Sequence, residues 1–348
     1  MAPHHCVDHV RPSRCRHAVT RDVDVSNFLS SLLDTAIVPG FSRIGFLARS
    51  RINHWDQVSA YDLTGKVVVI TGPTSGLGKE CVRILAPTGA QLVLVARNKE
   101  KCEDVISSVR SICTGPEPVC VVAEMGDLPS VGKAAREIAT RFPEVFAIVH
   151  NAGALLNSRE VSAQGIEQTV ASHVLGPHLL TTILLPNLIA AQGRVVTVSS
   201  GGMYSAELPN IDGKRSLEMR ADSYNGSKQY AIAKRAQVTL NEIWATKERA
   251  VHFDAMHPGW ADTPGVQESI PAFRRITKPI LRSAQQGADT IAWLAAVQPI
   301  PGASGSFWSD REVRGIHKIP TTRRSDTAEA RTHLWNWCNQ TIAPYVSE

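Results

Sequence analysis

The residues from 71 to 78, Thr-Gly-Pro-Thr-Ser-Gly-Leu-Gly, form a glycine-rich stretch between a β-branched run and a helix-length segment. Glycines in such a turn allow the backbone amides at a helix N-terminus to approach a pyrophosphate closely. A nucleotide-triphosphate loop needs four residues between its first glycine and Gly-Lys, followed by Ser or Thr. Here five residues separate Gly72 from Gly78-Lys79, and Glu80 follows. The spacing therefore disfavours a kinase or ATPase and favours a dinucleotide.

The second chemical signal lies about 20 residues after the glycines, where NAD-specific folds carry an acid for the ribose 2′-hydroxyl. Residues 95–98 read Val-Ala-Arg-Asn and contain no acid. Arg97 could instead pair with a 2′-phosphate through a bidentate contact. The alternative is a surface arginine at a strand end. We predict that NADP(H) is preferred and that NAD(H) remains usable.

Six short apolar runs predict the scaffold that would position these residues. They cover residues 66–71, 91–96, 119–124, 145–150, 193–200 and 251–257. Apolar strands that alternate with helix-length segments are typical of a parallel sheet covered by helices on both faces. We predict an α/β fold with a Rossmann-type, doubly wound parallel sheet, in a single domain that spans residues 63–310.

The remaining residues fall at the two ends of the chain. Residues 1–25 show no periodicity and are predicted to be a tail, and residues 311–348 a second tail that contains a packing helix. Residues 26–62 are predicted to form an amphipathic, helical arm. Its apolar positions between 26 and 52 are flanked by arginines, a pattern that can lie on an anionic membrane surface. The alternative is an arm packed on its own domain or on a second subunit.

Composition excludes several classes of function. The 348 residues include 37 Lys+Arg and 32 Asp+Glu, a net charge of +5, and 43% of them are hydrophobic. These values indicate a soluble globular protein, and no long run of like charge points to nucleic acid. The seven cysteines are an odd number without a C-x-x-C pair. This disfavours a disulfide framework or a metal site and favours the cytoplasm.

Several motifs, in order along the chain, resemble the short-chain dehydrogenase/reductase family over roughly residues 63–310. They are the stretch 71–78, Asp127-Leu128, Asn151-Ala152-Gly153, Val198-Ser199-Ser200, a Tyr-x3-Lys helix, and His257-Pro258-Gly259 with Thr263. The stretches SSGGMY, YAIAKRAQ and HPGWADTPGV look most like the dehydrogenase/reductase member 12 subgroup. The order and spacing make the set far more specific than any one motif.

The resemblance implies an NAD(P)-dependent carbonyl reductase or alcohol dehydrogenase with a Ser-Tyr-Lys catalytic site. In it Ser200 would hold the substrate oxygen, and a tyrosine would exchange its proton. Two pairs fit, Tyr224 with Lys228 and Tyr230 with Lys234. A neighbouring ammonium makes the tyrosinate accessible near neutral pH. We choose Tyr230 and Lys234, because a glycine interrupts the first pair and an apolar helix face follows the second.

The resemblance also assigns cofactor contacts. Asp127 would bond the adenine, Asn151 and Gly153 would line the adenosine side, and the segment from Pro258 to Thr263 would meet the nicotinamide amide. The predicted cofactor-binding residues are Gly72, Thr74, Ser75, Gly76, Leu77, Gly78, Arg97, Asp127, Leu128, Asn151, Gly153, Tyr230, Lys234, Pro258, Gly259 and Thr263.

The chain departs from the family pattern at His173, which stands where the family has an Asn that orders a water in the proton relay. An imidazole can hold a water and can shuttle protons near neutral pH. A packing histidine is the alternative. This departure leaves room for a cofactor-binding regulatory or scaffold protein with little turnover. The expected partner is a small, lipophilic alcohol or carbonyl compound, and a homo-oligomer is compatible with the family.

Overall fold

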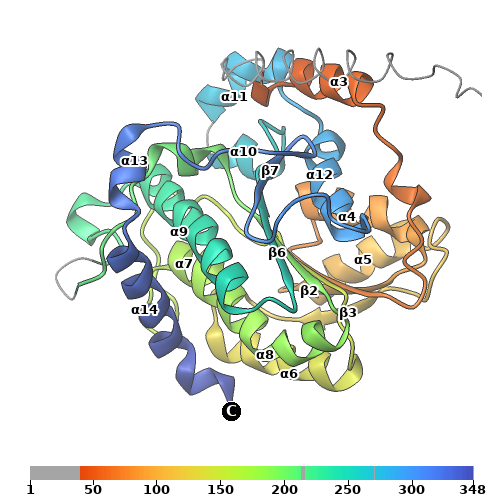
Figure 1. The fold of residues 1–348 in the computed structure, drawn as a ribbon, viewed down its shortest axis with the longest axis horizontal. Coiled ribbons are helices and arrows are strands. Elements are labelled where there is room, and N and C mark those ends of the chain that lie inside the picture. Colours follow the sequence, from red (N-terminus) through yellow and green to blue (C-terminus); the bar gives the residue numbers. More distant parts are fainter. Residues whose placement is uncertain (1–39, 213–215, 270, 348) are drawn as a thin grey trace, which may run out of the picture.

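The computed structural model describes residues 40–212, 216–269 and 271–347 (Figure 1). The predicted tail 1–25 and the predicted arm residues 26–39 lie outside the described residues. The part of the arm that is described, from Gly40 onward, packs on the domain through the buried side chain of Arg49.

The centre of the molecule is an eight-stranded sheet with the order β3-β2-β1-β4-β5-β6-β7-β8. All neighbours are parallel except β7 and β8. The strands are β1 (Val67–Thr71), β2 (Gln91–Ala96), β3 (Val119–Val122), β4 (Ala147–His150), β5 (Arg194–Val198), β6 (His252–Met256), β7 (Phe307–Ser309) and β8 (Glu312–Val313). The strand order reverses between β1 and β4, which opens a crevice at the carboxyl ends of the strands.

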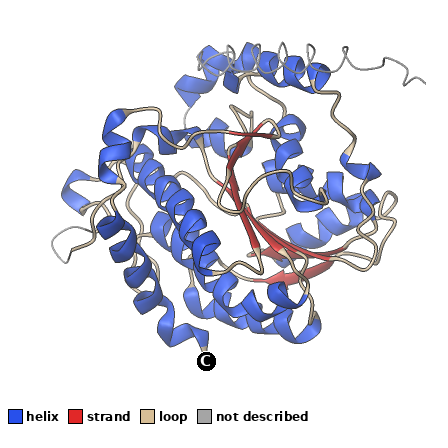
Figure 2. Ribbon diagram, in the orientation of Figure 1, coloured by secondary structure: helices blue, strands red, loops and turns tan. Residues whose placement is uncertain are grey.

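Helices cover both faces of the sheet (Figure 2). One core lies under α6 (Leu128–Arg141), α8 (Gly176–Ala190), α9 (Gly226–Lys247) and α14 (Ala328–Val346). The other lies under α4 (Gly76–Leu85), α5 (Lys99–Val109) and α12 (Ala284–Ala296). Among the described residues the remaining α-helices are α3 (Arg43–Ile52), α7 (Gln168–Val170), α10 (Pro264–Ser269), α11 (Pro271–Thr277) and α13 (Pro320–Ser325). The predicted doubly wound single domain is confirmed.

The six predicted strands are all present, but the sequence did not reveal β7 and β8. Each is only two or three residues long, too short for a periodic signal. Residue 310, where the predicted domain ends, lies in the turn between them. Residues 311–348, predicted to be a tail with a helix, contain α14, whose Leu334, Cys338 and Ile342 are buried in the core.

One helical stretch in the described part of the chain, Gln168–Ala190, is long and apolar enough to cross a membrane by length and composition. Its most apolar window is 67% buried inside the protein. The stretch belongs to the core formed with α6, α9 and α14. A helix that is buried on most sides in a globular protein is apolar all round. Its position is that of a core helix.

Candidate active site

The glycine-rich loop joins β1 to α4, and its glycines are required by the backbone. Gly72 and Gly76 have φ angles of 66° and 51°, in the left-handed region that favours glycine. A Cβ on Gly78 would lie 2.1 Å from the carbonyl oxygen of Gly72. The first turn of α4 can therefore approach the end of β1 only without a side chain here. Such a cradle fits the pyrophosphate of a dinucleotide.

Asn151, directly after β4, holds this loop in place. Its Nδ2 donates to the carbonyl oxygens of Thr71, at 3.1 Å, and of Gly72, at 3.0 Å. Thr71 Oγ1 in turn accepts from the backbone amides of Asn151 and Ala152. The side-chain amide group of Asn151 thus donates two hydrogen bonds to the loop and stabilises the cradle.

The predicted adenosine-side residues lie at the ends of β2 and β3. The Arg97 side chain is 79% exposed, and its Nη1 lies 3.6 Å from a carboxylate oxygen of Glu124. Asp127 Oδ1 accepts from Gln164 Nε2 at 2.8 Å. The Leu128 side chain is fully buried, so only its backbone can reach a ligand. Of Arg97, Asp127 and Leu128, only Arg97 has an exposed positive charge, which is suited to a phosphate at the surface.

The three predicted catalytic residues meet at the carboxyl end of β5. Ser200 follows the strand by two residues, and its hydroxyl accepts from the amide of Gly202 at 3.2 Å. Tyr230 is near enough to Ser200 for the serine side chain to lower the pKa of the phenol. Lys234, one turn later on α9, has its Nζ 5.4 Å from the centre of the Tyr230 ring and donates to the Val198 carbonyl at 2.8 Å. The arrangement places a hydroxyl, a phenol and an amine around one point.

Burial governs the protonation of these groups. It lowers the pKa of Lys234 to about 7. Burial also raises the pKa of Tyr230, and its interaction with the Ser200 side chain opposes that rise. An ammonium close to its own pKa can stabilise a tyrosinate or release a proton at little cost. The cluster is therefore suited to proton transfer near neutral pH.

Tyr224 has different surroundings from Tyr230. It precedes α9, whose N-cap is Asn225, and its hydroxyl donates to Glu167 Oε1 at 3.0 Å. Lys228, its counterpart in the Tyr-x3-Lys spacing, is exposed. Because Tyr224 lies outside the helix, the tyrosine and the lysine of this pair do not share a helix face.

His173 lies in a buried π-helical turn (Ala171–Leu175) before α8. Its Nε2 accepts from the Ala154 amide at 3.0 Å, so the neutral ring carries its proton on Nδ1. Burial, followed by the charge of Lys234, lowers the pKa of His173 well below its ordinary value. The lowered pKa favours the neutral imidazole over the imidazolium. A Cβ on Gly153 would lie 2.6 Å from Nε2, so this glycine makes room for the histidine.

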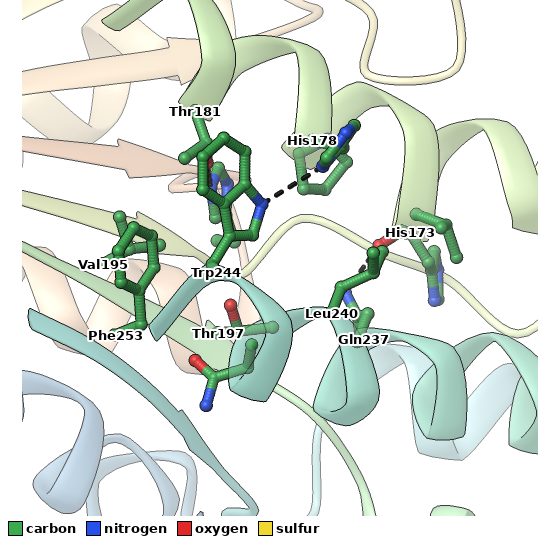
Figure 3. A pocket seen from close by; sticks show the side chains of 13 residues that line it. His173, His178, Thr181, Val195, Thr197, Gln237, Leu240, Trp244 and Phe253 are labelled. Atoms are coloured by element: carbon green, nitrogen blue, oxygen red, sulfur yellow. Dashed lines mark hydrogen bonds between the residues drawn. The ribbon is translucent and has the colours of Figure 1, made fainter. Parts of the chain in front are cut away.

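A cavity of about 30 Å³ lies behind His173, between α8, α9 and the sheet (Figure 3). It is lined by polar as well as apolar side chains, including His178, which accepts from Trp244 Nε1 at 3.1 Å. Gln237 donates to the His173 carbonyl at 2.7 Å. A polar cavity of this size suits about two ordered waters. Sequence reasoning missed Gln237, since a glutamine in a helix carries no signal of its own.

The remaining predicted residues lie after β6. The amide of Gly259 donates to His257 Nδ1 at 2.9 Å, and Gly259 has a φ angle of 74°. Thr263 lies across the crevice from the glycine-rich loop, because a Cβ on Gly76 would be 3.4 Å from its side chain. The end of this segment therefore lies beside the glycine-rich loop at the start of α4.

Comparisons with known proteins show what this chain is similar to. The family model described as short chain dehydrogenase matches residues 66–211. The Homo sapiens protein Dehydrogenase/reductase SDR family member 12 is 36% identical over 273 residues, 77% of this chain and 83% of that protein. Homo sapiens Retinol dehydrogenase 12 is 30% identical over 279 residues, 79% and 85% of the two chains. A crystal structure of a protein from Mycobacterium Paratuberculosis is similar with a TM-score of 0.63 and 23% identity, and covers 83% of this chain and 97% of its own.

Proposed function

Because the chain belongs to the short-chain dehydrogenase/reductase family, whose members are oxidoreductases that act on CH–OH groups, we propose that it is an NADP(H)-dependent carbonyl reductase or alcohol dehydrogenase. The observation that carries the proposal is the meeting of Ser200, Tyr230 and Lys234 at the end of β5. The test is oxidation of NADPH by the full chain in the presence of a panel of aldehydes and ketones, followed at the cofactor's absorbance.

The proposed mechanism follows from the protonation of these residues. When bound, the nicotinamide cofactor supplies or accepts the hydride. Ser200 orients the substrate oxygen by a hydrogen bond, and the Tyr230 hydroxyl donates its proton to that oxygen during reduction. Lys234 stabilises the resulting tyrosinate, which is costly in a buried site without a nearby positive charge. In alcohol oxidation the same proton moves in the opposite direction.

The cofactor would lie over the glycine-rich loop, with its adenosine end toward β2. A phosphate on the ribose 2′-oxygen would meet Arg97, the exposed cation at the end of that strand. The neighbouring Glu124 would repel the phosphate, so Arg97 must exchange its weak 3.6 Å contact for the phosphate. This exchange favours NADP(H), since a charge-assisted bidentate contact is stronger than a long, exposed ion pair.

We expect Arg97→Asp to lower kcat/KM for NADPH by about 10–100-fold, because a charged hydrogen bond to the phosphate is replaced by repulsion. The kcat/KM value for NADH should stay the same or rise. Steady-state kinetics with both cofactors measures the effect. Arg110→Asp is the matched control, since Arg110 is an exposed arginine whose partner, Glu117, accepts from Gln91 at the opposite end of β2. If the ratio of kcat/KM for NADPH to kcat/KM for NADH were the same in Arg97→Asp as in the wild type, the proposed preference would be contradicted.

We further propose that the substrate is lipophilic and that the arm contacts a membrane. Among the relatives, Retinol dehydrogenase 12 carries in its name an apolar alcohol. On α3 the Ile44 side chain is 62% exposed, with the exposed arginines Arg43 and Arg51 on the same short helix. An exposed aliphatic side chain among cations suits the surface of an anionic bilayer.

The membrane proposal predicts that Ile44→Glu reduces binding of the full chain to vesicles with anionic lipids. The reason is that a carboxylate replaces the inserted apolar group and is repelled by the headgroups. Co-flotation with phosphatidylserine vesicles measures this. Ile112→Glu, at another exposed isoleucine beyond α5, is the control and should bind like the wild type. Equal flotation of all three proteins would mean that Ile44 and the arm do not bind the membrane.

One observation favours a second candidate function, a cofactor-binding regulatory or scaffold protein. His173 stands at the position of the relay Asn, and Gln237 already donates a hydrogen bond to its carbonyl. NADPH binding without turnover across the carbonyl panel would favour this candidate.

The described cysteines are all free, which favours a reducing compartment such as the cytoplasm. Members of the family often form oligomers, and a homo-oligomer is proposed on that ground.

A further inference from the structure

The segment Gly40–Ser42, just before α3, lies beside the candidate active site although it is about 160 residues away from Ser200 along the chain. The carbonyl of Phe41 accepts a hydrogen bond from the Trp260 amide at 2.9 Å. A Cβ on Gly201, the residue after Ser200, would lie 3.5 Å from Cε2 of the Phe41 ring. Phe41 therefore bridges the two loops that flank the site, one after β5 and one after β6.

The Phe41 ring belongs to an aromatic group that these loops complete. Its centre lies 4.4 Å from that of His257 and 6.0 Å from that of Trp260, both edge to face. The Tyr204 ring lies 6.3 Å away and nearly parallel. Tyr204 is buried, whereas Phe41 and Trp260 are only half-buried. Lys318 Nζ lies 4.9 Å from the centre of the Phe41 ring and covers part of it, so only the remaining part of the ring and of Trp260 is exposed.

A buried ion cluster holds this segment against the domain. Asp310 lies in the tight turn between β7 and β8, with a φ angle of 55°. Its carboxylate accepts from Arg282 through both oxygens and from Arg49 of α3. Arg282 also donates to the carbonyls of Pro258 and Gly40. One cluster therefore joins the segment before α3, the loop after β6 and the edge of the sheet.

The cluster makes the position of Phe41 rigid. All three charged side chains are at most 2% exposed, so none can leave its partners without stranding a buried charge. Arg282 further donates to the Ser42 carbonyl at 3.2 Å, and Arg49 to that of Gly40 at 3.1 Å. The backbone is thus held on both sides of Phe41. A fixed aromatic ring beside a reacting group provides a preorganised contact.

We propose that Phe41 is a specificity-determining residue that forms one wall of the substrate site and selects flat, apolar carbonyl or alcohol substrates. The proposal rests on the oxidoreductase function proposed above. A ring that bridges the loop of Ser200 and the loop of Trp260 is placed to lie along the part of the substrate that does not react. Arg282, Asp310 and Arg49 act as positioning residues, since they hold Phe41 and do not touch the reacting atoms.

The test compares two probe substrates of different size, 9,10-phenanthrenequinone and diacetyl, with NADPH. We expect Phe41→Ala to lower kcat/KM for phenanthrenequinone by at least about tenfold, the loss typical of a missing apolar contact. The value for diacetyl, which is too small to reach the wall, should change by less than about threefold. An equal fall for both probes, or no fall, would overturn the proposal.

Phe46→Ala tests whether Phe41 contacts the substrate or only helps to hold the segment in place. Phe46 lies on α3, 5.4 Å from Trp55 and 5.5 Å from the Arg282 guanidinium by ring centre, and so helps to anchor the same segment. This variant should lower the melting temperature while it leaves the ratio of the two kcat/KM values near that of the wild type. A shift of the ratio equal to that of Phe41→Ala would mean that anchoring alone explains the effect.

A binding measurement distinguishes this proposal from the proposed function. If the wild type reduces neither probe, the oxidoreductase proposal fails, and the wall is tested by quenching of tryptophan fluorescence with phenanthrenequinone. A dissociation constant at least about tenfold weaker in Phe41→Ala than in the wild type would support the wall without turnover. Equal affinity, or no binding to the wild type, would overturn it.

Discussion

Tyr230→Phe is expected to lower kcat by about 10²–10⁴-fold, the contribution typical of a positioned general acid or base. The substitution removes the only atom of Tyr230 that can exchange a proton and leaves the ring in place beside Lys234. The affinity for NADPH should change little, because the aromatic ring and Lys234 remain. Steady-state kinetics and fluorescence titration with NADPH measure the two quantities separately.

Tyr224→Phe is the matched control for this prediction. It removes a hydroxyl that donates to the buried Glu167, 3.0 Å away, so a loss of stability of about 1–3 kcal/mol is expected. Turnover of the folded variant should stay within a few-fold of the wild type. Full activity of Tyr230→Phe with loss in Tyr224→Phe would reverse the assignment of the catalytic tyrosine. Loss in both would point to a shared structural effect.

The second large effect is expected at Asp310, where Asp310→Asn should lower the free energy of unfolding by about 3–5 kcal/mol. The substitution keeps the size of the side chain and suits the left-handed backbone, but it removes the charge between two buried guanidinium groups. Arg49 and Arg282 would then be buried without a counter-charge. Urea unfolding followed by circular dichroism gives the free energy.

The pH dependence of this effect has a defined sign. Burial alone would raise the pKa of Asp310, but the charges and hydrogen bonds of Arg282 and then Arg49 outweigh it and lower the pKa below its ordinary value. A carboxylate with a depressed folded pKa contributes stability above its unfolded pKa, near 4, and loses it as the pH falls through the folded value. The difference between the wild type and Asp310→Asn should therefore be full at pH 7 and shrink below pH 4.

Asp222→Asn is the control for Asp310→Asn. Asp222 also pairs with an arginine, Arg220, but both side chains are exposed, and exposed pairs contribute little. Its replacement should leave the unfolding curve essentially unchanged. If Asp310→Asn behaved in the same way, the buried cluster would not be what anchors α3 and the loop after β6.

The sequence alone was sufficient for the repetitive parts of the fold and for the motifs that follow strands. The runs at 66–71 and 91–96 form β1 and β2, because a buried parallel strand needs an uninterrupted apolar run that is visible in one segment. Several of the predicted site residues, such as Gly72, Asn151, Ser200 and Pro258, come soon after strands, and the carboxyl ends of parallel strands meet at one edge of a sheet. Tyr230 and Lys234 instead lie on α9.

Tertiary structure alone decided the features that depend on single residues. His173 matched a family position, but only the folded structure shows that burial lowers its pKa and that its ring accepts from the Ala154 amide. Arg49 and Asp310 are 261 positions apart, and an isolated arginine or aspartate has no periodicity that could reveal its partner. Phe41 reaches the site in the same way, through a contact with Trp260 that no spacing predicts. Secondary structure depends on short-range sequence patterns. A long-range polar contact depends on which distant residues the folded chain brings together.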